Sequence, residues 1–322
     1  MILITGANGL IGSFIVRKCV EQGEQIRILA RKNADLSLIA NLIDTIEIFE
    51  GDILDIPLLE KACEGIEKLI HCAAIVSFGE AGIDTMFKVN VEGTKNIVNT
   101  CLKMQVRQLV YLSSIAAIGR DPKIDITDEN TLWVESDLNS AYAKSKYGAE
   151  LEVWRGTEEG LNASMLNPSI VLGPGNWNKS STKIFKNIHE GIQFYPSGFV
   201  NVVDVRDVAD AAYLLLKSNT MQERYIINGH HISYKDFFTQ IAVGFGKRPP
   251  SLQLSKPLAL VAYYLLKLFF PFYLKKRFIN RETIVISSSN FRYSNQKFKK
   301  AFNFSYRPLN ETIKWTCNEI LK

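Results

Sequence analysis

A glycine-rich turn near the start of the chain is the feature that most limits its possible folds. Gly6, Gly9 and Gly12 are spaced G-x-x-G-x-x-G between the apolar run Ile2–Thr5 and a helical pattern over Leu10–Glu21. The backbone must bend sharply here, approach a pyrophosphate and pack helix on strand, and each task favours a missing side chain. The helix start then offers free N–H groups and a positive dipole end to phosphates. We therefore predict a dinucleotide-binding turn with contacts from Thr5, Gly6, Asn8, Gly9, Leu10, Ile11 and Gly12.

Short apolar runs alternate with helical patterns along the first half of the chain. The expected strands are Ile2–Thr5, Gln25–Ala30, Thr45–Phe49, Lys68–Cys72, Gln108–Ser113 and Ala163–Leu166. This alternation predicts an α/β fold, a Rossmann doubly wound parallel sheet with helices on both faces. The rhythm ends after Pro168, where Gly173-Pro174-Gly175 marks a loop. We expect an NAD(P)-binding Rossmann domain at 1–168 and a smaller, mostly helical substrate lobe at 169–322, with about 200–228 returning to the sheet.

The cysteines and histidines point to neither disulfides nor a metal. The five cysteines are odd in number and form no C-x-x-C pair, which is typical of reduced thiols in a cytoplasm. The four histidines lack ligand spacing, so we predict no metal site and place His230-His231 in a surface turn. Met1 leads directly into the first apolar run without a basic leader, so we expect a cytoplasmic protein.

Positive charge gathers toward the end of the chain. The net charge is +5, but residues 256–322 hold 13 Lys and Arg against 3 Asp and Glu. This pattern predicts either a solvated basic surface or attraction to an anionic partner, such as a phosphorylated substrate or a membrane. Nucleic acid is not expected as a partner, because no recognition module accompanies the charge.

The apolar and aromatic stretch 257–277 lies in this basic region. Lys267 and Pro271 interrupt it, so it is too short to span a bilayer. Three interpretations stay open for it: packing over the substrate lobe, a protein interface, or peripheral membrane contact. The last is suggested by Lys275-Lys276-Arg277, which directly follow the apolar residues.

The end of the second predicted strand bears on which dinucleotide is bound. A cofactor with a free ribose 2′-hydroxyl usually meets an acidic residue here, about 20 residues after the glycines. This chain has Ala30-Arg31-Lys32 instead, and Arg31 can hold a 2′-phosphate through paired N–H donors. The sequence therefore favours NADP(H) over NAD(H), with contacts from Arg31 and Lys32. The alternative is that both cations are solvated and NAD is tolerated.

Residues after the third and fourth predicted strands complete the expected cofactor edge. Asp52 is expected to accept a hydrogen bond from the adenine amino group, with Ile53 covering the ring, although Asp after Gly is also a common turn residue. Ala73 and Ala74 are small, which lets the backbone approach the cofactor.

A tyrosine and a lysine supply the strongest catalytic candidates. Tyr142 and Lys146 form Y-x-x-x-K, and the i, i+4 spacing puts both on one helical face. Four such pairs occur, at Tyr142, Tyr213, Tyr263 and Tyr293, so the spacing alone is weak. Only Tyr142 begins the helix that follows the fifth strand. That strand ends at Ser113-Ser114, so Ser114 and Tyr142 are both expected at the cofactor crevice.

Taken together, these residues resemble an extended short-chain dehydrogenase/reductase of the NAD-dependent epimerase/dehydratase family. The matching segments, in the family's order over residues 1–210, are Thr5–Gly12, Gly51-Asp52, Asn90–Asn96, Ser113-Ser114, Tyr142/Lys146 and Val203–Ala209. Asn167–Gly175 resembles the subgroup of dihydroflavonol and cinnamoyl-CoA reductases, as does Phe291–Leu309 less specifically.

The resemblance implies a role for each site residue. Tyr142 would exchange a proton with the substrate oxygen, and a nearby Lys146 ammonium would lower the phenol pKa and hold the ribose. Ser114 would orient the substrate carbonyl for hydride attack. Asn90 would hold the polar network of the site, with a purely structural helix Asn as the alternative. The backbone at Pro168, Ile170 and Val171 would border the nicotinamide. The resemblance also implies a homodimer through the helices at 83–103 and 140–159.

Three functions compete on this fold. The first is an NADP(H)-dependent oxidoreductase acting on a small-molecule carbonyl or alcohol; the others are a sugar-nucleotide epimerase and a non-catalytic dinucleotide sensor. Ile115-Ala116 stand where 4,6-dehydratases of the family carry an Asp-Glu pair, and Arg31 disfavours the tightly held NAD of epimerases. The intact Tyr/Lys pair disfavours a sensor. The oxidoreductase is therefore preferred, with fold analogy carrying much of the preference.

Two further features concern the substrate. Bulky apolar residues of the second half, Trp177, Phe185, Phe194, Tyr195 and Phe199, suggest an apolar or aromatic carbonyl substrate, with an ordinary lobe core as the alternative. Six acids between Asp121 and Asp137 predict a mobile loop over the site.

Overall fold

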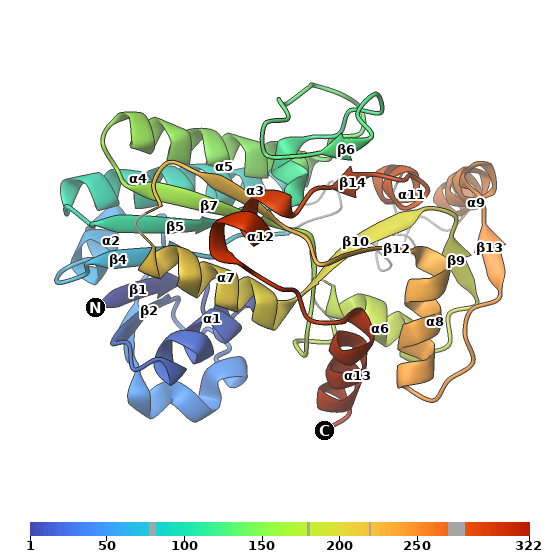
Figure 1. The fold of residues 1–322 in the computed structure, drawn as a ribbon, viewed down its shortest axis with the longest axis horizontal. Helices are drawn as coiled ribbons and strands as arrows, with labels where there is room; N and C mark the ends of the chain where they lie inside the picture. The colour runs from blue at the N-terminus through green and yellow to red at the C-terminus, as the bar shows by residue number, and fades with distance from the viewer. Residues whose placement is uncertain (77–81, 179–180, 219, 270–280) are drawn as a thin grey trace.

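Seven parallel strands form the main sheet, in the order β11-β7-β5-β4-β1-β2-β3 (Figure 1). The computed structural model describes residues 1–76, 82–178, 181–218, 220–269 and 281–322. The strands are β1 (Ile2–Thr5), β2 (Ile26–Ala30), β3 (Glu47–Glu50), β4 (Lys68–His71), β5 (Gln108–Leu112), β7 (Ala163–Pro168) and β11 (Arg224–Ile227). This sheet confirms the predicted Rossmann fold. Its seventh strand comes from the second half of the chain.

Helices cover both faces of this sheet. The helices α2 (Ile56–Ala62), α4 (Gly93–Lys103) and α5 (Ala141–Glu158) pack on one face, and α1 (Leu10–Glu21) and α7 (Val205–Lys217) pack on the other (Figure 1). Each face has its own apolar cluster. This double cover explains why the interior strand β5 is buried at all of its positions.

The helix expected over 83–103 contains a π turn. The segments α3 (Ile83–Phe87), η2 (Lys88–Glu92) and α4 follow one another directly, and η2 is the π-helical one. Such turns often occur at functional sites. Two 3-10 helices, η1 (Ser37–Thr45) and η3 (Ile115–Ile118), follow β2 and β5.

The order of the strands places a ligand-binding crevice. The strands β2 and β3 lie on one side of β1, whereas β4, β5, β7 and β11 lie on the other. Open α/β sheets bind ligands beyond the carboxyl ends of the strands at such a switch point. The loops after β1, β4 and β5 therefore meet at one edge.

A second, smaller region follows β7. It contains a three-stranded sheet of β8 (Ile170–Leu172), β10 (Phe199–Asp204) and β12 (His230–Ser233), and a pair of β9 (Phe194–Pro196) with β13 (Leu252–Leu254). Its helices are α6 (Thr182–His189), α8 (Tyr234–Gly244), α9 (Lys256–Phe269), α11 (Arg281–Ser287), α12 (Gln296–Phe302) and α13 (Leu309–Ile320). In Figure 1 most of these lie to the right of the main sheet.

One expectation for this region was wrong. His230 and His231 lie in strand β12 and not in a surface turn, because β12 pairs with β10 and His231 contacts Asn201 and Asn290 through its ring nitrogens. Phe185 and Tyr195 are buried in the apolar cluster of this region. They therefore form its core, which was the alternative to substrate contact. Among the described residues, no group of three or more side chains could hold a metal ion.

Part of the stretch 257–277 is helix α9. The exposed apolar residues of this helix are Leu258, Val261, Tyr264, Leu265 and Phe269. No helix in the described ranges is long and apolar enough to cross a membrane. The rest of this stretch, 270–277, lies outside the described ranges, which resume at residue 281.

The acidic segment 121–137 is tied to the body of the protein at its centre, which differs from the mobile loop expected. Its strand β6 (Ile126–Thr127) pairs with β14 (Arg292–Tyr293). Glu129 accepts a hydrogen bond from the backbone N–H of Ile226 in β11 at 2.9 Å. Charge alone made the segment look solvated, whereas a partner about a hundred residues later holds it.

Candidate active site

The glycine turn between β1 and α1 is packed against itself and against the end of β4. Gly6 has a φ of +70°, and a Cβ there would lie 2.6 Å from the backbone N of Ala73. A Cβ on Gly12 would lie 2.2 Å from the carbonyl oxygen of Gly6. At Gly9 the nearest atom to a Cβ is that same oxygen at 3.4 Å, which is ordinary contact. Gly6 and Gly12 are therefore required by the fold, whereas Gly9 is not.

Buried polar groups hold the ends of β1 and β4 together. Thr5 Oγ1 lies 2.6 Å from His71 Nδ1 and accepts a hydrogen bond from the N–H of Ala73 at 3.3 Å. His71 Nε2 lies 3.1 Å from Thr94 Oγ1. Burial lowers the pKa of His71 to about 3, so the ring is neutral and can accept a hydrogen bond at one nitrogen while donating one at the other. The predicted contact residues Thr5 and Ala73 thus line one rigid edge, with Ala74 exposed next to it.

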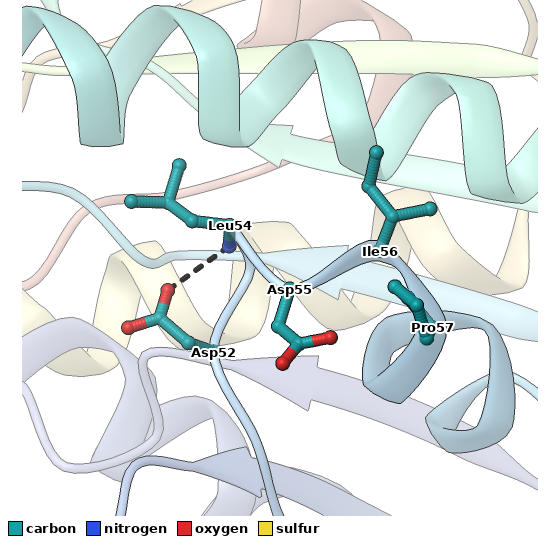
Figure 2. Close-up of a pocket in the computed structure, with 5 residues that line it drawn as sticks. All are labelled: Asp52, Leu54, Asp55, Ile56 and Pro57. Atoms are coloured by element: carbon teal, nitrogen blue, oxygen red, sulfur yellow. Dashed lines mark hydrogen bonds between the residues drawn. The ribbon is translucent and has the colours of Figure 1, made fainter.

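The other predicted cofactor residues follow β2 and β3 at the same edge. Arg31 and Lys32 are exposed directly after β2. Asp52 accepts a hydrogen bond from the N–H of Leu54 at 3.0 Å, which is the turn role considered as the alternative. Figure 2 shows Asp52 at a surface hollow of about 470 Å³ whose further lining residues are Leu54, Asp55, Ile56 and Pro57. Ile53 is buried, and its side chain packs against Gly93 of α4.

Ser114 and Tyr142 meet at the carboxyl end of β5. Tyr142 lies in the first turn of α5, whose N-terminus is capped by the Ser140 side chain accepting from the N–H of Ala143 at 3.1 Å. Burial raises the pKa of Tyr142, and its side-chain hydrogen bond with Ser114 opposes that rise. The expected lowering by Lys146 is not found in this chain. Tyr142 is therefore a neutral phenol at neutral pH.

Lys146 lies one helical turn after Tyr142 and is 2% exposed. Its Nζ donates hydrogen bonds to Tyr111 Oη at 2.6 Å and to the carbonyl oxygen of Leu112 at 2.9 Å. Burial lowers its pKa to about 7, and the carboxylate of Glu150 opposes that shift. Lys146 does not lower the pKa of Tyr142, because a lysine with a pKa of about 7 has already lost its charge at the pH where the phenol ionises.

These residues, their order and the sheet agree with one known group of proteins. The NAD dependent epimerase/dehydratase family matches this chain over residues 2–228. The chain belongs to this family. It is therefore an NAD(P)-dependent enzyme of the extended short-chain dehydrogenase/reductase type, and the predicted resemblance is confirmed.

Individual relatives of this family member cover most of the chain. Sterol demethylase protein B of Methylococcus capsulatus is 28% identical over 277 residues, 84% of this chain and 83% of its own. Cinnamoyl-CoA reductase 1 of Petunia hybrida is 30% identical over 242 residues, 70% of this chain and 72% of its own. The solved structure of gox2253 is 32% identical with a TM-score of 0.85, and the match covers 100% of this chain and 98% of that one.

The residues of this family member fit the dinucleotide that the family binds. Gly9 is the N-cap of helix α1 and offers no capping side chain, so the first N–H groups of the helix can meet a phosphate. A bare backbone at Gly9 allows close approach, since the chain itself does not need the glycine there. Ser169 Oγ, between the predicted nicotinamide neighbours Pro168 and Ile170, is buried without a hydrogen-bond partner among the described residues.

The remaining predicted cofactor residues lie around this turn. Leu10 packs toward Gly173 and Gly175 of the loop after β8, since Cβ atoms there would lie 3.4 and 3.3 Å from its Cδ1. Asn8 is exposed and Ile11 half-buried. Val171 is buried in β8. The first helix therefore touches the loop that begins the second region.

Asn90 lies in the π-helical segment η2, and its side chain forms hydrogen bonds with the backbone of Ile75. Its Oδ1 accepts from the N–H of Ile75 at 2.7 Å, and its Nδ2 donates to the carbonyl of Ile75 at 2.9 Å and to Ser145 Oγ at 3.0 Å. Ser145 in turn donates to the carbonyl of Tyr142 at 2.8 Å. Asn90 thus links the segment after β4 to the start of α5. These contacts are those of a positioning residue.

Sequence reasoning missed three residues around Lys146. Tyr111 accepts the lysine's hydrogen bond, and Glu150 and Asn167 lie beyond it. A signal existed for Glu150, because it continues the i, i+4 spacing of Tyr142 and Lys146. Tyr111 carried no such signal, because it lies in a short, mainly apolar strand in which all five side chains are buried.

Proposed function

We propose that the protein is an NADP(H)-dependent oxidoreductase that transfers hydride between the nicotinamide and a carbonyl or alcohol substrate, with Tyr142 as acid/base. The observation that carries this proposal is the Ser114–Tyr142 pair at the cofactor edge of the sheet. Names of relatives, among them a cinnamoyl-CoA reductase, support the reductive direction.

Each side chain has a defined part in this reaction. Bound NADP(H) would supply the hydride at the carbonyl carbon. Tyr142, kept neutral by burial, donates its phenolic proton to the carbonyl oxygen, and Ser114 donates a hydrogen bond that orients that oxygen. Lys146 would hold the ribose hydroxyls of the bound cofactor through its ammonium N–H donors. The same groups act in reverse for an alcohol.

The 2′-phosphate is proposed to bind at Arg31 and Lys32. Both side chains are exposed directly after β2, where a carboxylate would repel a phosphate. A guanidinium can form two parallel hydrogen bonds to a phosphate, which supports NADP(H) over NAD(H).

The substrate is proposed to be a bulky, largely apolar carbonyl compound. The named relatives include a sterol demethylase protein and a cinnamoyl-CoA reductase, whose names denote large apolar or aromatic groups. Trp177 of the second region is half-buried, and Phe194 and Phe199 are exposed. They are available for such a group, in contrast to the buried Phe185 and Tyr195.

The test is a screen of aldehydes, ketones and UDP-sugars with Tyr142→Phe as the key variant. We expect wild-type protein to consume NADPH with a carbonyl substrate, and Tyr142→Phe to lose at least about 100-fold in kcat while keeping NADPH affinity. The matched control is Tyr213→Phe, because Tyr213 also precedes a lysine by four residues but hydrogen-bonds Glu24 on α7's side of the sheet. Turnover that survives in Tyr142→Phe refutes the acid/base role, and sugar interconversion without net NADPH consumption favours the epimerase.

Peripheral membrane contact is proposed for helix α9. Leu258, Val261, Leu265 and Phe269 recur at helical spacing on its exposed side. Lys256 and Lys267 are exposed on the same helix, which has no acidic residue. An apolar face with cations beside it suits an anionic lipid surface. Co-sedimentation with anionic vesicles is expected for wild type and lost in Leu265→Glu; equal binding by both would exclude α9.

A homodimer through the helices at 83–103 and 140–159 is also proposed. α4 and α5 lie side by side on one face of the sheet (Figure 1), and Leu151 of α5 is 49% exposed. Light scattering is expected to give twice the mass of 36.4 kDa, reduced to the single mass in Leu151→Glu.

A further inference from the structure

A buried carboxylate lies one turn beyond the Tyr142/Lys146 pair. Glu150 continues their spacing along α5 and is 1% exposed. Side chains at i and i+4 on a helix have Cβ atoms about 6 Å apart, so Glu150 is a close neighbour of the lysine. An ionised group at such depth needs partners, because burial without them is costly.

The partners of Glu150 lead to the other catalytic candidate. Asn167 Nδ2 donates to Glu150 Oε1 at 2.5 Å and also to the carbonyl oxygen of Ser114 at 2.9 Å. One amide group at the end of β7 therefore joins the carboxylate on α5 to the main chain of the serine after β5. Glu150 is therefore a neighbour of Lys146 on α5 and is linked to Ser114 through Asn167.

The second carboxylate oxygen of Glu150 faces Arg224, most of whose N–H groups donate to backbone carbonyl oxygens. Arg224 Nη1 lies 3.4 Å from Glu150 Oε2. The other donors of Arg224 meet the carbonyl oxygen of Glu129 at 2.9 and 2.7 Å and that of Thr131 at 3.0 Å. The carboxylate of Glu129 in turn accepts a hydrogen bond from the N–H of Ile226, two residues after Arg224 on β11. Glu150 is thus paired with Arg224 at 3.4 Å and at the same time opposes the lowering of the Lys146 pKa.

We propose that Glu150 is a positioning residue that keeps the Lys146 ammonium charged and, through Asn167, holds the main chain at Ser114. This proposal rests on the proposed function and deepens it. Glu150 itself does not touch substrate or cofactor. It acts on them through Lys146 and Ser114.

The charges and titratable groups around Lys146 and Glu150 support this assignment. They are His71 and Cys72 at the end of β4, Tyr111 on β5, Tyr142 on α5 and Arg224 on β11. Burial keeps His71 uncharged and raises the pKa values of Cys72 and Tyr111, so these three are neutral at neutral pH. Because these three groups are uncharged, Glu150 is the ionised group near Lys146 that favours the lysine's charged form.

The experiment compares pH profiles of Glu150→Gln, Glu150→Asp and wild type. Gln keeps the shape and can still accept from Asn167, but it removes the charge, whereas Asp keeps the charge. Loss of an opposite charge near a buried group changes its titration by about one to three pH units. We expect the alkaline limb of kcat for carbonyl reduction to move down by that amount in Glu150→Gln and to stay in place in Glu150→Asp. Glu152→Gln is the matched control, since Glu152 is on the same helix but pairs with Arg155.

A second readout separates this proposal from the proposed function. The affinity for NADPH, followed by nicotinamide fluorescence, is measured over the same pH range and needs no substrate. If Tyr142→Phe keeps full turnover, the proposed function fails. The role of Glu150 is then decided by the pH at which NADPH affinity falls in each variant. An unshifted limb in Glu150→Gln, an equal shift in Glu150→Asp, or a Glu150→Gln protein that does not fold would each overturn the proposal. In the last case the carboxylate would serve the fold and not the lysine.

Discussion

Replacing the buried lysine is expected to stabilise the fold while removing the activity. Lys146 is 2% exposed, and burial lowers its pKa from 10.5 to about 7. Because the folded-state pKa lies below the unfolded one, the unfolded chain binds more protons between these two values. Stability therefore rises as the pH rises from about 7 toward 10.5, and the cost of the charge is fully present below pH 7.

The magnitude follows from the shift and the contacts. Linkage over this pKa difference costs the folded wild type about 4 kcal/mol at neutral pH. Lys146→Met keeps the unbranched stem but loses the hydrogen bonds to Tyr111 and Leu112, worth about 1 kcal/mol each. The variant is thus expected to be more stable by about 2 kcal/mol near pH 7, and this gain should vanish by about pH 9.5.

Urea unfolding of both proteins at several pH values, followed by circular dichroism, measures this difference. Lys144→Met is the control on the same helix, because Lys144 is exposed and pairs with Glu135, so its replacement should change little at any pH. A Lys146→Met protein that is less stable at neutral pH, or a gain that does not shrink as the pH rises, would refute the reasoning about the buried charge.

The remaining predictions concern the cofactor edge. Gly12→Ala should destabilise the fold by about 1–3 kcal/mol, because its Cβ would lie 2.2 Å from the Gly6 carbonyl oxygen, whereas Gly9→Ala should leave the midpoint of unfolding unchanged and weaken NADPH binding. Thermal unfolding and fluorescence titration measure the two effects, and a Gly9→Ala protein that binds normally would place the pyrophosphate elsewhere. Arg31→Asp should reduce the preference for NADPH over NADH by at least about 10-fold, since a phosphate contact is replaced by a like charge. A preference equal to that of wild type would show that Arg31 is only solvated.

Local sequence patterns predicted many of the helices and strands of this fold. The helix expected over Leu10–Glu21 has those bounds in the structure, because its glycine turn and apolar periodicity lie within one short segment. The main strands were also expected from short runs, since most of them lie under helices on both faces and are therefore mainly apolar. The family's motif order then placed the site at one edge of the sheet.

Contacts between distant segments escaped the same reasoning. The acidic segment was expected to be mobile, yet Arg224 holds the carbonyl oxygens of Glu129 and Thr131 across more than ninety residues. His230 and His231 were assigned to a turn, although strand β10 pairs with them. Nothing within a few residues of either segment encodes its partner.

The catalytic pair shows the same division most clearly. The sequence by itself determined that Tyr142 and Lys146 share a helical face, because the helix repeat depends only on the local backbone. Only the tertiary structure decided where the lysine's hydrogen bonds go and how its charge is balanced. Those depend on Tyr111 from β5 and on Glu150, which is held by Asn167 of β7 and Arg224 of β11. Burial and Coulomb energy depend on distance in space, and the sheet brings these groups together from more than a hundred residues of chain.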